Sequence, residues 1–383
     1  MNNRKRYLVI TEKFTPRKGG SNTTFDEIYR RIGDKDTHIV TCDQPGAAAF
    51  DTTHPNTVHR LSLDRHRWLR PESLAIYAKL VATSLVLAAR YEFDEVHAGR
   101  VLSEGLVGLL VARLKGLPLV IYAHGEEITT WRQPGKFQAM VFTYRQADRL
   151  NVNSNFTRRE LLKLGVKPER IVLILPGVDL KQFRPGLEAS DLRTLLSMTE
   201  GQKLILSVGR LSRRKGFDQV IHSLPFLVDK GINAQYAIVG IGEDRDYLLF
   251  LARELAVSDR VHILGHVSSD DLPRWFNAAD VFAMPNRNIN GDTEGFGMVF
   301  LEAAACGKPA VAGHAGGTGD AVADGMTGLR VDGGSLEEVA AALERLLEDP
   351  GFAERLGSSG YARASKAFSW DVVAEKISAI FKG

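Results

Sequence analysis

Two carboxylates eight residues apart, Glu294 and Glu302, enclose a segment that suits a phosphorylated ligand. Between them, the backbone amides of Phe296, Gly297 and Met298 are expected in the first turn of a helix, where unpaired amides and the helix dipole bind phosphate. Glu302 would lie about 9 Å beyond Phe296, at ~1.5 Å per residue. This order fits a nucleotide-sugar, with Glu294 accepting hydrogen bonds from sugar hydroxyls and Glu302 from both ribose hydroxyls. The alternative interpretation is a helix with one capping acid and one exposed acid.

A second group of charged residues follows a predicted strand that ends at Gly209. Arg210 comes directly after that glycine, and Lys215 follows in the basic turn 212–216. Ligands of open α/β sheets lie beyond the carboxyl ends of the strands. Both cations are therefore placed to neutralise a diphosphate leaving group. The alternative is a solvated basic turn.

Strands and helices alternate along the chain, and this alternation brings such turns to one edge of a sheet. Short apolar, β-branched runs predict strands, and longer amphipathic runs predict helices. In the first half, the predicted strands are 7–11, 38–42, 95–98, 119–123 and 150–153, with helices at 73–90 and 103–115. In the second half, the predicted strands are 203–208, 235–239, 261–264, 281–284 and 309–312, with helices at 220–229, 247–255 and 299–305. The pattern predicts an α/β protein with two Rossmann-like, doubly wound parallel sheets.

The boundary between the two predicted domains falls in the Pro- and Gly-rich segment 176–186. We therefore predict an N-terminal acceptor-binding domain over residues 1–180 and a C-terminal nucleotide-sugar-binding domain over residues 181–368. The last segment, 369–383, predicts an amphipathic helix, because Val373, Ile377 and Ile380 share one face. We expect this helix to pack back on the N-terminal domain.

The composition is that of a globular protein in a reducing compartment. Hydrophobic residues make up 44% and charged residues 25%, which argues against a disordered chain. The two cysteines, Cys42 and Cys306, lie far apart in apolar surroundings and predict no disulfide framework. The first apolar run, 7–10, is too short for a signal sequence, and no later run reaches ~18 apolar residues. We expect a cytoplasmic protein.

Positive charge is concentrated in the first half of the chain. Residues 1–165 contain 25 Lys and Arg against 17 Asp and Glu, and the remaining residues contain 24 against 29. A basic half suggests an anionic partner, with ordinary surface variation as the alternative. Within it, the segment 60–70 mixes cations with Trp68 and leucines, which fits anionic lipid headgroups as well as a basic surface loop. Lipid contact would place the protein peripherally on the inner face of the plasma membrane.

Several motifs occur together in an order that is typical of one enzyme family. They are Gly209-Arg210-Leu211, Lys215-Gly216, the Glu294–Glu302 element, Ala303–Pro309 and Gly316-Gly317. Their order and spacing resemble the retaining glycosyltransferases of family 4, whose GT-B architecture has two Rossmann-like domains facing a cleft. The stretch 279–297 looks like that of the bacterial phosphatidylinositol-mannoside mannosyltransferases. The resemblance extends over nearly the whole chain.

The resemblance implies a set of site residues in the C-terminal half. They are Arg210 and Lys215 for the diphosphate, Glu294 for the transferred sugar, Glu302 for the ribose, Gly209 and the backbone of Phe296, Gly297 and Met298 for the phosphates, and Val267 and Gly240 for the base pocket. For Gly240, a tight strand–helix turn is the alternative interpretation. One departure follows the second glycine pair, where the chain reads Thr318-Gly319-Asp320 and many relatives have a proline and a glutamate.

In the N-terminal half, the resemblance singles out a glycine pair and a histidine. Gly19 and Gly20 follow the first predicted strand, as in the family loop that closes against the phosphates of the sugar donor. A simple turn is the alternative. His124 ends a predicted strand, where the family has a functional histidine near the transferred sugar.

These features predict a retaining, metal-independent hexosyltransferase. GDP-mannose is the favoured sugar donor, and the acceptor would be a glycan, a glycolipid or another lipid-linked molecule of the bacterial envelope. A UDP-sugar donor and a non-catalytic nucleotide-sugar-binding module are the alternatives. We expect no cofactor, no metal and no nucleic acid partner, because the Asp-x-Asp patterns at 34–36 and 244–246 are read as chance and no His/Cys cluster has zinc spacing. A dinucleotide oxidoreductase is disfavoured, since 240–242 carries only a fragment of its glycine motif.

Overall fold

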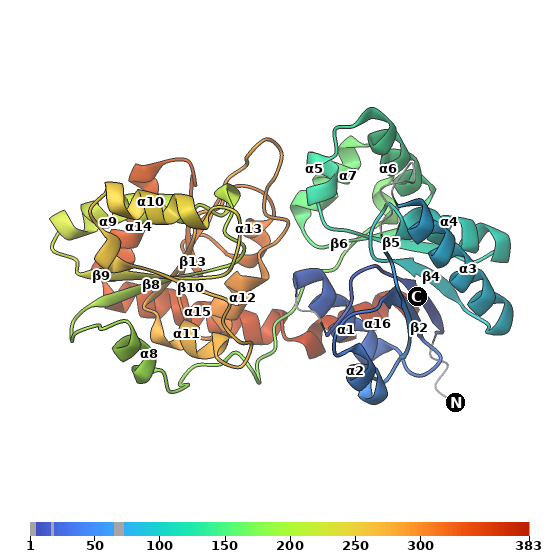
Figure 1. Ribbon diagram of the computed structural model, residues 1–383, viewed down its shortest axis with the longest axis horizontal. Coiled ribbons are helices and arrows are strands. Elements are labelled where there is room, and N and C mark those ends of the chain that lie inside the picture. The colour runs from blue at the N-terminus through green and yellow to red at the C-terminus, as the bar shows by residue number, and fades with distance from the viewer. Residues whose placement is uncertain (1–4, 17–18, 65–72, 383) are drawn as a thin grey trace. The chain divides into compact units, whose positions relative to one another are not determined.

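In a computed structural model that describes residues 5–16, 19–64 and 73–382, the chain forms two compact units. The first unit comprises Met1–Pro176 and Trp370–Gly383, and the second comprises Gly177–Ser369. Each unit is built on one parallel sheet with helices packed on it (Figure 1). The predicted fold class, two Rossmann-like doubly wound sheets, is confirmed.

The first unit contains a seven-stranded sheet with the order β3-β2-β1-β4-β5-β6-β7, and all of its strand pairs are parallel. The strands are β1 (Tyr7–Ile10), β2 (His38–Cys42), β3 (Thr57–Leu61), β4 (Glu95–Ala98), β5 (Leu119–Ala123), β6 (Arg149–Val152) and β7 (Ile171–Leu173). The helices are α1 (Gly20–Ile32), α2 (Ala47–Thr53), α3 (Leu74–Arg90), α4 (Glu104–Lys115), α5 (Glu126–Thr130), α6 (Pro134–Gln146), α7 (Asn155–Lys163) and α16 (Trp370–Lys382).

The core of the first unit follows from covering a parallel sheet on both faces, which requires nearly continuous apolar strands. Strands β1 and β5 are buried at every residue. Strand β4 is the exception, because it buries Glu95 and His97. Glu95 is satisfied by contacts of 2.8 Å to His97 Nε2, to Lys5 Nζ and to an Arg149 guanidinium nitrogen. Burial raises the pKa of Glu95, but these partners outweigh it and hold the pKa at about 2.

The last helix, α16, packs against α1 within the first unit. Its Phe381 ring is buried, with its centroid 5.9 Å from that of Tyr7 and 5.4 Å from that of His97. At the other end of the helix, Asp371 accepts a hydrogen bond of 2.9 Å from Arg31 on α1. An apolar face inward and an ion pair at the rim are typical of an amphipathic helix docked on its own domain.

The second unit contains a six-stranded parallel sheet with the order β10-β9-β8-β11-β12-β13. The strands are β8 (Lys203–Val208), β9 (Ala234–Val239), β10 (Val261–Gly265), β11 (Val281–Met284), β12 (Ala310–Gly313) and β13 (Gly328–Val331). The helices are α8 (Ser190–Leu195), α9 (Phe217–Asp229), α10 (Arg245–Glu254), α11 (Leu272–Ala278), α12 (Met298–Ala305), α13 (Thr318–Ala321), α14 (Leu336–Glu348) and α15 (Pro350–Ala367).

Both sheets reverse their winding direction once. In the first unit the chain winds outward from β1 to β3 and then returns to β4 on the other side of β1. In the second unit it winds from β8 to β10 and then returns to β11 beside β8. At such a point the loops after the two central strands diverge and leave a crevice, which is where open α/β sheets bind ligands. The loops after β1 and β4, and those after β8 and β11, are therefore the first places to look for a site.

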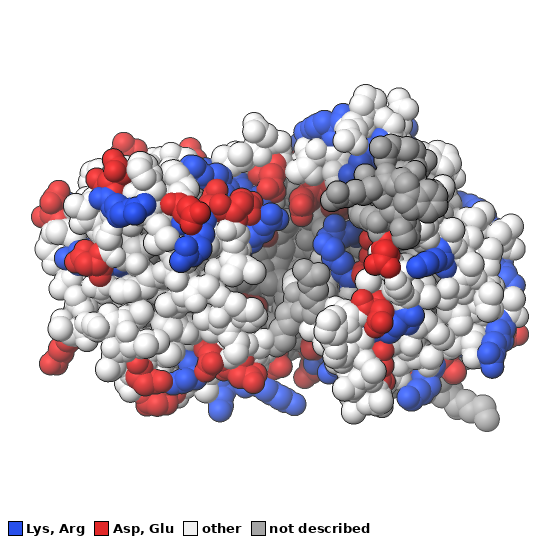
Figure 2. All heavy atoms as spheres, in the orientation of Figure 1, with Lys and Arg blue, Asp and Glu red and all other residues white. Residues whose placement is uncertain are grey.

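Acidic and basic side chains intermingle on the face of each unit that Figure 2 shows. Several cations of the basic first unit are paired, for example Arg6 with Glu92 and Asp94. Arg60 of the segment 60–70 is paired with Asp51 at 2.7 Å, so its guanidinium group forms an ion pair within the unit. Residues 65–70 of that segment lie outside the described residues. Among the helices that the structure describes, none is long and apolar enough to cross a bilayer.

Candidate active site

The reversal point of the second sheet brings together one carboxylate and two cations. The 3-10 turn Arg213–Lys215 follows β8, and the loop that carries Glu294 follows β11. Lys215 Nζ lies 2.5 Å from Glu294 Oε2, and Arg214 Nη1 lies 3.0 Å from the same oxygen. Lys215 is buried and Glu294 is nearly so. The structure thus brings two of the predicted site residues, Lys215 and Glu294, into direct contact.

Glu294 is held as a carboxylate by its neighbours. Burial alone would raise its pKa, but the charges of Lys215 and Arg214 and their hydrogen bonds outweigh burial and lower the pKa to about 2. A carboxylate that stays ionised near neutral pH accepts hydrogen bonds without donating any. The group is therefore suited to binding hydroxyls.

A glycine pair after β12 fixes the backbone of Glu294. Gly317 donates its amide to the Glu294 carbonyl at 2.8 Å. Gly316 has a φ of +76°, and a Cβ on it would lie 2.0 Å from the same carbonyl oxygen. The missing proline and glutamate of this loop leave this contact intact. Thr318 also anchors the loop, because its hydroxyl donates to the Gly313 carbonyl at 2.6 Å.

The basic turn after β8 is fixed to the end of β11. A Cβ on Gly216, whose φ is +75°, would lie 2.1 Å from the Pro285 carbonyl oxygen, so only glycine permits this approach. The Arg214 carbonyl accepts a hydrogen bond of 2.8 Å from the Arg287 amide. Arg287 also pairs with the buried Asp218 of α9 at 2.6 Å. These contacts determine where Lys215 and Arg214 point.

Arg210 is not part of this cluster. Its exposed side chain lies 3.0 Å from Glu243 Oε2, in the loop after β9. Arg214 takes the place beside Glu294, although it was not among the predicted site residues. The signal was present as three consecutive cations, Arg213, Arg214 and Lys215. The 3-10 turn determines which of these side chains faces the carboxylate. The direction of each side chain in the turn cannot be predicted from one sequence.

Backbone packing requires the glycine that follows β9. Gly240 has a φ of +147°, and a Cβ on it would lie 1.8 Å from the Gly209 carbonyl oxygen. The Gly209 amide donates to Val239 at 2.9 Å, and the Gly240 amide donates to Gly265 at 2.8 Å. These contacts explain why the turn needs a glycine, and the place of Gly240 in the base pocket stays a prediction. Val267 is half-buried two residues beyond β10, at the same edge of the sheet.

Helix α12 begins at Met298, with Gly297 as its N-cap at φ +87°. This is one residue before the predicted helix 299–305 and two residues after Phe296, whose amide was expected in the first turn. The Phe296 side chain is buried, so this residue enters the core before the helix starts. Glu302 lies four residues beyond Met298, the first residue of the helix, which is about 6 Å along the helix axis. The sequence had suggested about 9 Å, counted from Phe296. The spacing between the first amides of the helix and the carboxylate is correspondingly shorter.

In the first unit, His124 follows β5 and is fixed at two points. Its Nε2 lies 2.9 Å from the Gly99 carbonyl, so this nitrogen must donate. Its backbone amide donates to Glu127 Oε1 at 3.0 Å, and Tyr144 donates to the same oxygen. Burial lowers the pKa of His124. The neutral ring with a proton on Nε2 leaves Nδ1 as a hydrogen-bond acceptor.

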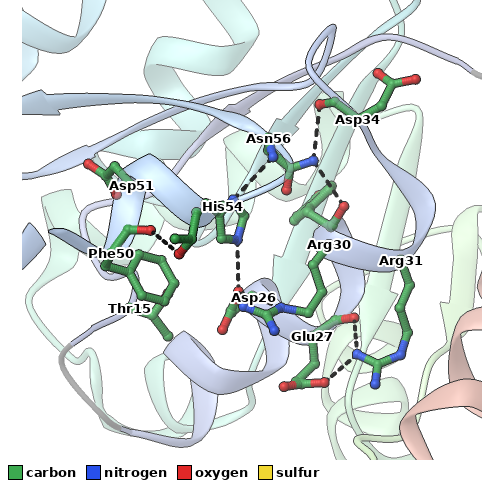
Figure 3. Close-up of polar contacts among 12 residues, drawn as sticks. Thr15, Asp26, Glu27, Arg30, Arg31, Asp34, Phe50, Asp51, His54 and Asn56 are labelled. Carbon is green, nitrogen blue, oxygen red and sulfur yellow. Dashed lines mark hydrogen bonds and ion pairs between the residues drawn. The ribbon is translucent and has the colours of Figure 1, made fainter. Parts of the chain in front are cut away.

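Gly19 and Gly20 are exposed at the start of α1. The residues that lead to them are fixed by side chains, because Arg60 donates to the Thr15 carbonyl at 2.7 Å and Gln44 donates to the Phe14 carbonyl at 2.8 Å. Figure 3 shows the neighbouring contact of 2.9 Å between His54 Nε2 and Asp26 on α1. This network binds α2 and the segment after it to α1.

A second buried carboxyl, Glu104, lies at the reversal point of the first sheet. It is the first residue of α4, and its Oε1 accepts a hydrogen bond of 2.5 Å from the Glu12 amide, after β1. Within the described residues, its other oxygen has no hydrogen-bond partner. Burial raises the pKa of Glu104 to about 8. This carboxyl is therefore protonated at neutral pH, unlike Glu294.

Comparison with known proteins identifies the family of the chain. Residues 18–182 match the family described as Glycosyltransferase Family 4, and residues 192–363 match Glycosyl transferases group 1. The GDP-mannose-dependent alpha-(1-6)-phosphatidylinositol monomannoside mannosyltransferase of Mycobacterium tuberculosis is 32% identical, over 99% of this chain and 98% of its own length. The chain belongs to glycosyltransferase family 4. The resemblance seen in the sequence motifs is confirmed.

Two further proteins place this family 4 glycosyltransferase among its relatives. The D-inositol 3-phosphate glycosyltransferase of Frankia alni is 33% identical over 74% of this chain and 73% of its own length. The structure of Anabaena HepE in complex with UDP and glucose covers 99% of this chain and 100% of its own, with a TM-score of 0.83 and 22% identity. The second likeness concerns the fold alone, and it supports the GT-B architecture.

The contact between Gly316 and Glu294 can be tested by substitution. Gly316→Ala places a Cβ against the Glu294 carbonyl, whereas Gly325→Ala, at a similar φ of +66°, meets nothing within 4 Å. Both variants should lose about 1 kcal/mol or more of stability to backbone strain. Only Gly316→Ala should also lower transferase activity, by at least ~10-fold, because it displaces Glu294. Equal activity in the two variants would contradict a positioning role for Gly316.

The raised pKa of Glu104 predicts a pH dependence of stability. Between pH 4.5 and about 8 the unfolded chain loses this proton while the folded chain keeps it, so the free energy of unfolding falls as the pH rises through that interval. Glu104→Gln removes the titration, so its Tm relative to the parent should rise by several degrees between pH 5 and pH 8. Exposed Glu169→Gln is the control. Parallel Tm curves for parent and Glu104→Gln would show that the carboxyl is not protonated in the folded chain.

Proposed function

We propose that this chain is a retaining mannosyltransferase that transfers mannose from GDP-mannose to a glycan, a glycolipid or another lipid-linked acceptor of the bacterial envelope. The observation that carries the proposal is the contact between Lys215 and Glu294 at the reversal point of the second sheet. It joins a cation suited to a diphosphate with a carboxylate suited to sugar hydroxyls. A nucleotide-sugar needs both groups side by side.

The proposal that the donor carries mannose and guanine is supported by the names of similar proteins. The Mycobacterium tuberculosis enzyme, which matches this chain over nearly its whole length, is named for GDP-mannose. The same enzyme and the Frankia alni glycosyltransferase are named for acceptors that carry an inositol phosphate group. A lipid-linked acceptor would bring this chain to the inner face of the plasma membrane as a peripheral protein. A UDP-sugar donor and a non-catalytic binding module remain the competing functions.

In this proposal Lys215 and Arg210 stabilise the departing diphosphate. The ion pair of Arg210 with Glu243 is exposed, and such pairs contribute at most about 1 kcal/mol, so a diphosphate can replace Glu243. The first amides of α12 add positive dipole ends, and Gly19 and Gly20 supply further backbone to the phosphates. These groups provide the charge that a metal ion provides in other transferases, so turnover is expected to persist in EDTA.

The carboxylate and imidazole would orient the sugars. Glu294 would bind hydroxyls of the transferred mannose, Glu302 would bind the ribose, and Val267 would lie at the base. His124 would accept a sugar hydroxyl at Nδ1. Because Glu294 is occupied by Lys215 and Arg214, it is not a free nucleophile. We therefore propose front-face displacement, in which the acceptor hydroxyl attacks the anomeric carbon, the bond to the diphosphate breaks, and the leaving oxygen takes the proton.

The direct experiment offers the enzyme GDP-mannose, UDP-glucose or UDP-N-acetylglucosamine with phosphatidylinositol monomannoside in vesicles, with and without EDTA. The proposal predicts a product with one added α-linked mannose, from GDP-mannose alone, at a rate unaffected by EDTA. Transfer from a UDP-sugar instead would establish the first competing function. Binding of a nucleotide-sugar with neither transfer nor hydrolysis would establish the second.

The leaving-group role predicts the effect of removing one cation. Lys215→Ala should lower kcat/KM by about 100-fold or more, which is the usual cost of losing one electrostatic stabiliser of the transition state. Lys230→Ala is the matched control, because Lys230 is exposed and pairs with Glu344 on another helix of the same unit. Near-normal turnover of Lys215→Ala, with the control also normal, would exclude the proposed role.

A further inference from the structure

His124 is held by its carbonyl as well as by its ring and its amide. The carbonyl accepts a hydrogen bond of 3.3 Å from Asn153 Nδ2, in the segment after β6. The ring donates from Nε2 to the Gly99 carbonyl after β4, and the amide donates to Glu127 Oε1 on α5. Three parts of the chain thus fix one residue. The nitrogen assigned to a sugar hydroxyl, Nδ1, therefore keeps one direction.

The groups around the imidazole are themselves fixed. The Gly99 amide donates to the Ile10 carbonyl at 2.9 Å, and a Cβ on Gly99 would lie 2.6 Å from Thr11 Oγ1, which leaves no room for a side chain. Phe25 of α1 meets the imidazole edge-on, with the ring centroids 6.1 Å apart. The Nε2 proton of His124 therefore has a fixed acceptor, and that acceptor determines the tautomer of the ring.

A network of side chains ties α5 to α7 around the same histidine. Gly125, between His124 and α5, has a φ of +94°, and a Cβ on it would lie 2.7 Å from Thr157 Oγ1 on α7. The Thr157 hydroxyl donates to Asn153 Oδ1 at 2.8 Å, and Asn153 in turn donates to the His124 carbonyl. The start of α5, which carries Glu127, therefore cannot shift independently of His124.

Glu127 is the one charged group among the three hydrogen-bond partners of His124 given above. Its side chain is buried, and Oε1 accepts both the His124 amide at 3.0 Å and the hydroxyl of buried Tyr144 at 2.6 Å. Burying a carboxylate costs free energy even when it is hydrogen-bonded. A glutamine oxygen would accept the same two hydrogen bonds without that cost. The charge of Glu127 is therefore the feature that needs an explanation.

That charge acts on the imidazole. Burial has the largest effect on the pKa of His124 and lowers it, and the charge of Glu127 comes next and raises it. The charge of Arg100 lowers the pKa, whereas the hydrogen bond to Gly99 and the charge of exposed Glu126 have smaller, upward effects. A histidine with its proton on Nε2 accepts at Nδ1 only while it is neutral, and this capacity is lost as the pH falls through the pKa of the folded chain.

We propose that Glu127 is a positioning residue that holds His124 so that Nδ1 can accept a hydroxyl of the transferred sugar. This rests on the proposed function, in which His124 contacts that sugar. Glu127 acts through the amide and the ring of His124, because its own side chain is buried. Its charge also sets the lowest pH at which the ring remains an acceptor. Tyr144 contributes by fixing the oxygen that the His124 amide reaches.

The test compares Glu127→Ala and Glu127→Gln with the parent chain. Glu127→Ala should lower kcat/KM for mannose transfer by about 10-fold or more, because two buried donors lose their acceptor. Glu127→Gln keeps an oxygen for both donors and should recover most of this loss. Exposed Glu126→Gln, on the same helix, is the matched control. The Tm of each variant shows whether it is folded.

The pH dependence separates positioning from a merely structural role. In Glu127→Gln the imidazolium loses a nearby negative charge, so the acid limb of the kcat/KM profile should move to lower pH by about half a unit or more. Glu126→Gln should move it less. The pKa of His124, measured by NMR on histidine-labelled chain and assigned with His124→Asn, should fall in parallel.

An unchanged pKa of His124 in Glu127→Gln would overturn the proposal, and this result does not depend on which sugar donor the enzyme uses. A lower pKa with an unshifted activity profile would overturn it as well, because the ring would then not act in transfer. A fall in Tm without a shift of the acid limb would leave Glu127 a structural residue only. Absence of transfer by the parent chain would count against the proposed function instead, and the NMR titration would still show whether Glu127 controls His124.

Discussion

The burial of Glu294 between Lys215 and Arg214 is the constraint on which the second unit depends. A carboxylate removed from water must be paired and hydrogen-bonded, since an unpaired buried charge costs several kcal/mol. Pairing it with two residues that follow β8 fixes the turn after β8 to the loop after β11. Asn286 strengthens the same edge, because its side chain accepts the amide of Gly313, at the end of β12, and donates to the carbonyl of Ala315, just beyond it. The ends of three neighbouring strands thus form one rigid frame around the carboxylate.

Each sheet has a buried glutamate at its reversal point, but the two glutamates have opposite pKa shifts. At each reversal point a buried glutamate bonds a neighbouring loop, but Glu294 is held ionised and Glu104 is held protonated. The difference lies in the partners. Glu294 contacts two cations, whereas Glu104 contacts a backbone amide. The charges of Arg100 and Lys13 lower the pKa of Glu104 only weakly compared with the effect of burial. An ionised carboxylate with two cationic partners and a protonated carboxyl with a backbone partner are two distinct uses of one architecture.

The sequence predicted the fold class and the central strands because buried parallel strands read as continuous apolar runs. It missed β3, β7 and β13, which lie at sheet edges or carry half-buried polar residues such as His59 and Arg330. Lys215 and Glu294 are 79 residues apart in the sequence, and they meet because β8 and β11 are neighbours in the sheet. The partners of Arg210 and Arg214 were not predictable, because they depend on the direction of side chains in a short turn. Arg60 shows the same limit, since a cation in a basic stretch turned out to pair inside the unit.

Whether Glu294 binds the transferred sugar is the central claim, and one comparison tests it most directly. Titration calorimetry would measure the Kd of GDP-mannose and of GDP for the parent chain and for Glu294→Gln. If Glu294 contacts the mannose, the substitution should weaken GDP-mannose by at least ~10-fold more than it weakens GDP, since only the sugar-bearing ligand loses a contact. An equal change in both affinities would contradict the claim, because it would mean that Glu294 acts only by holding Lys215 and Arg214 in place.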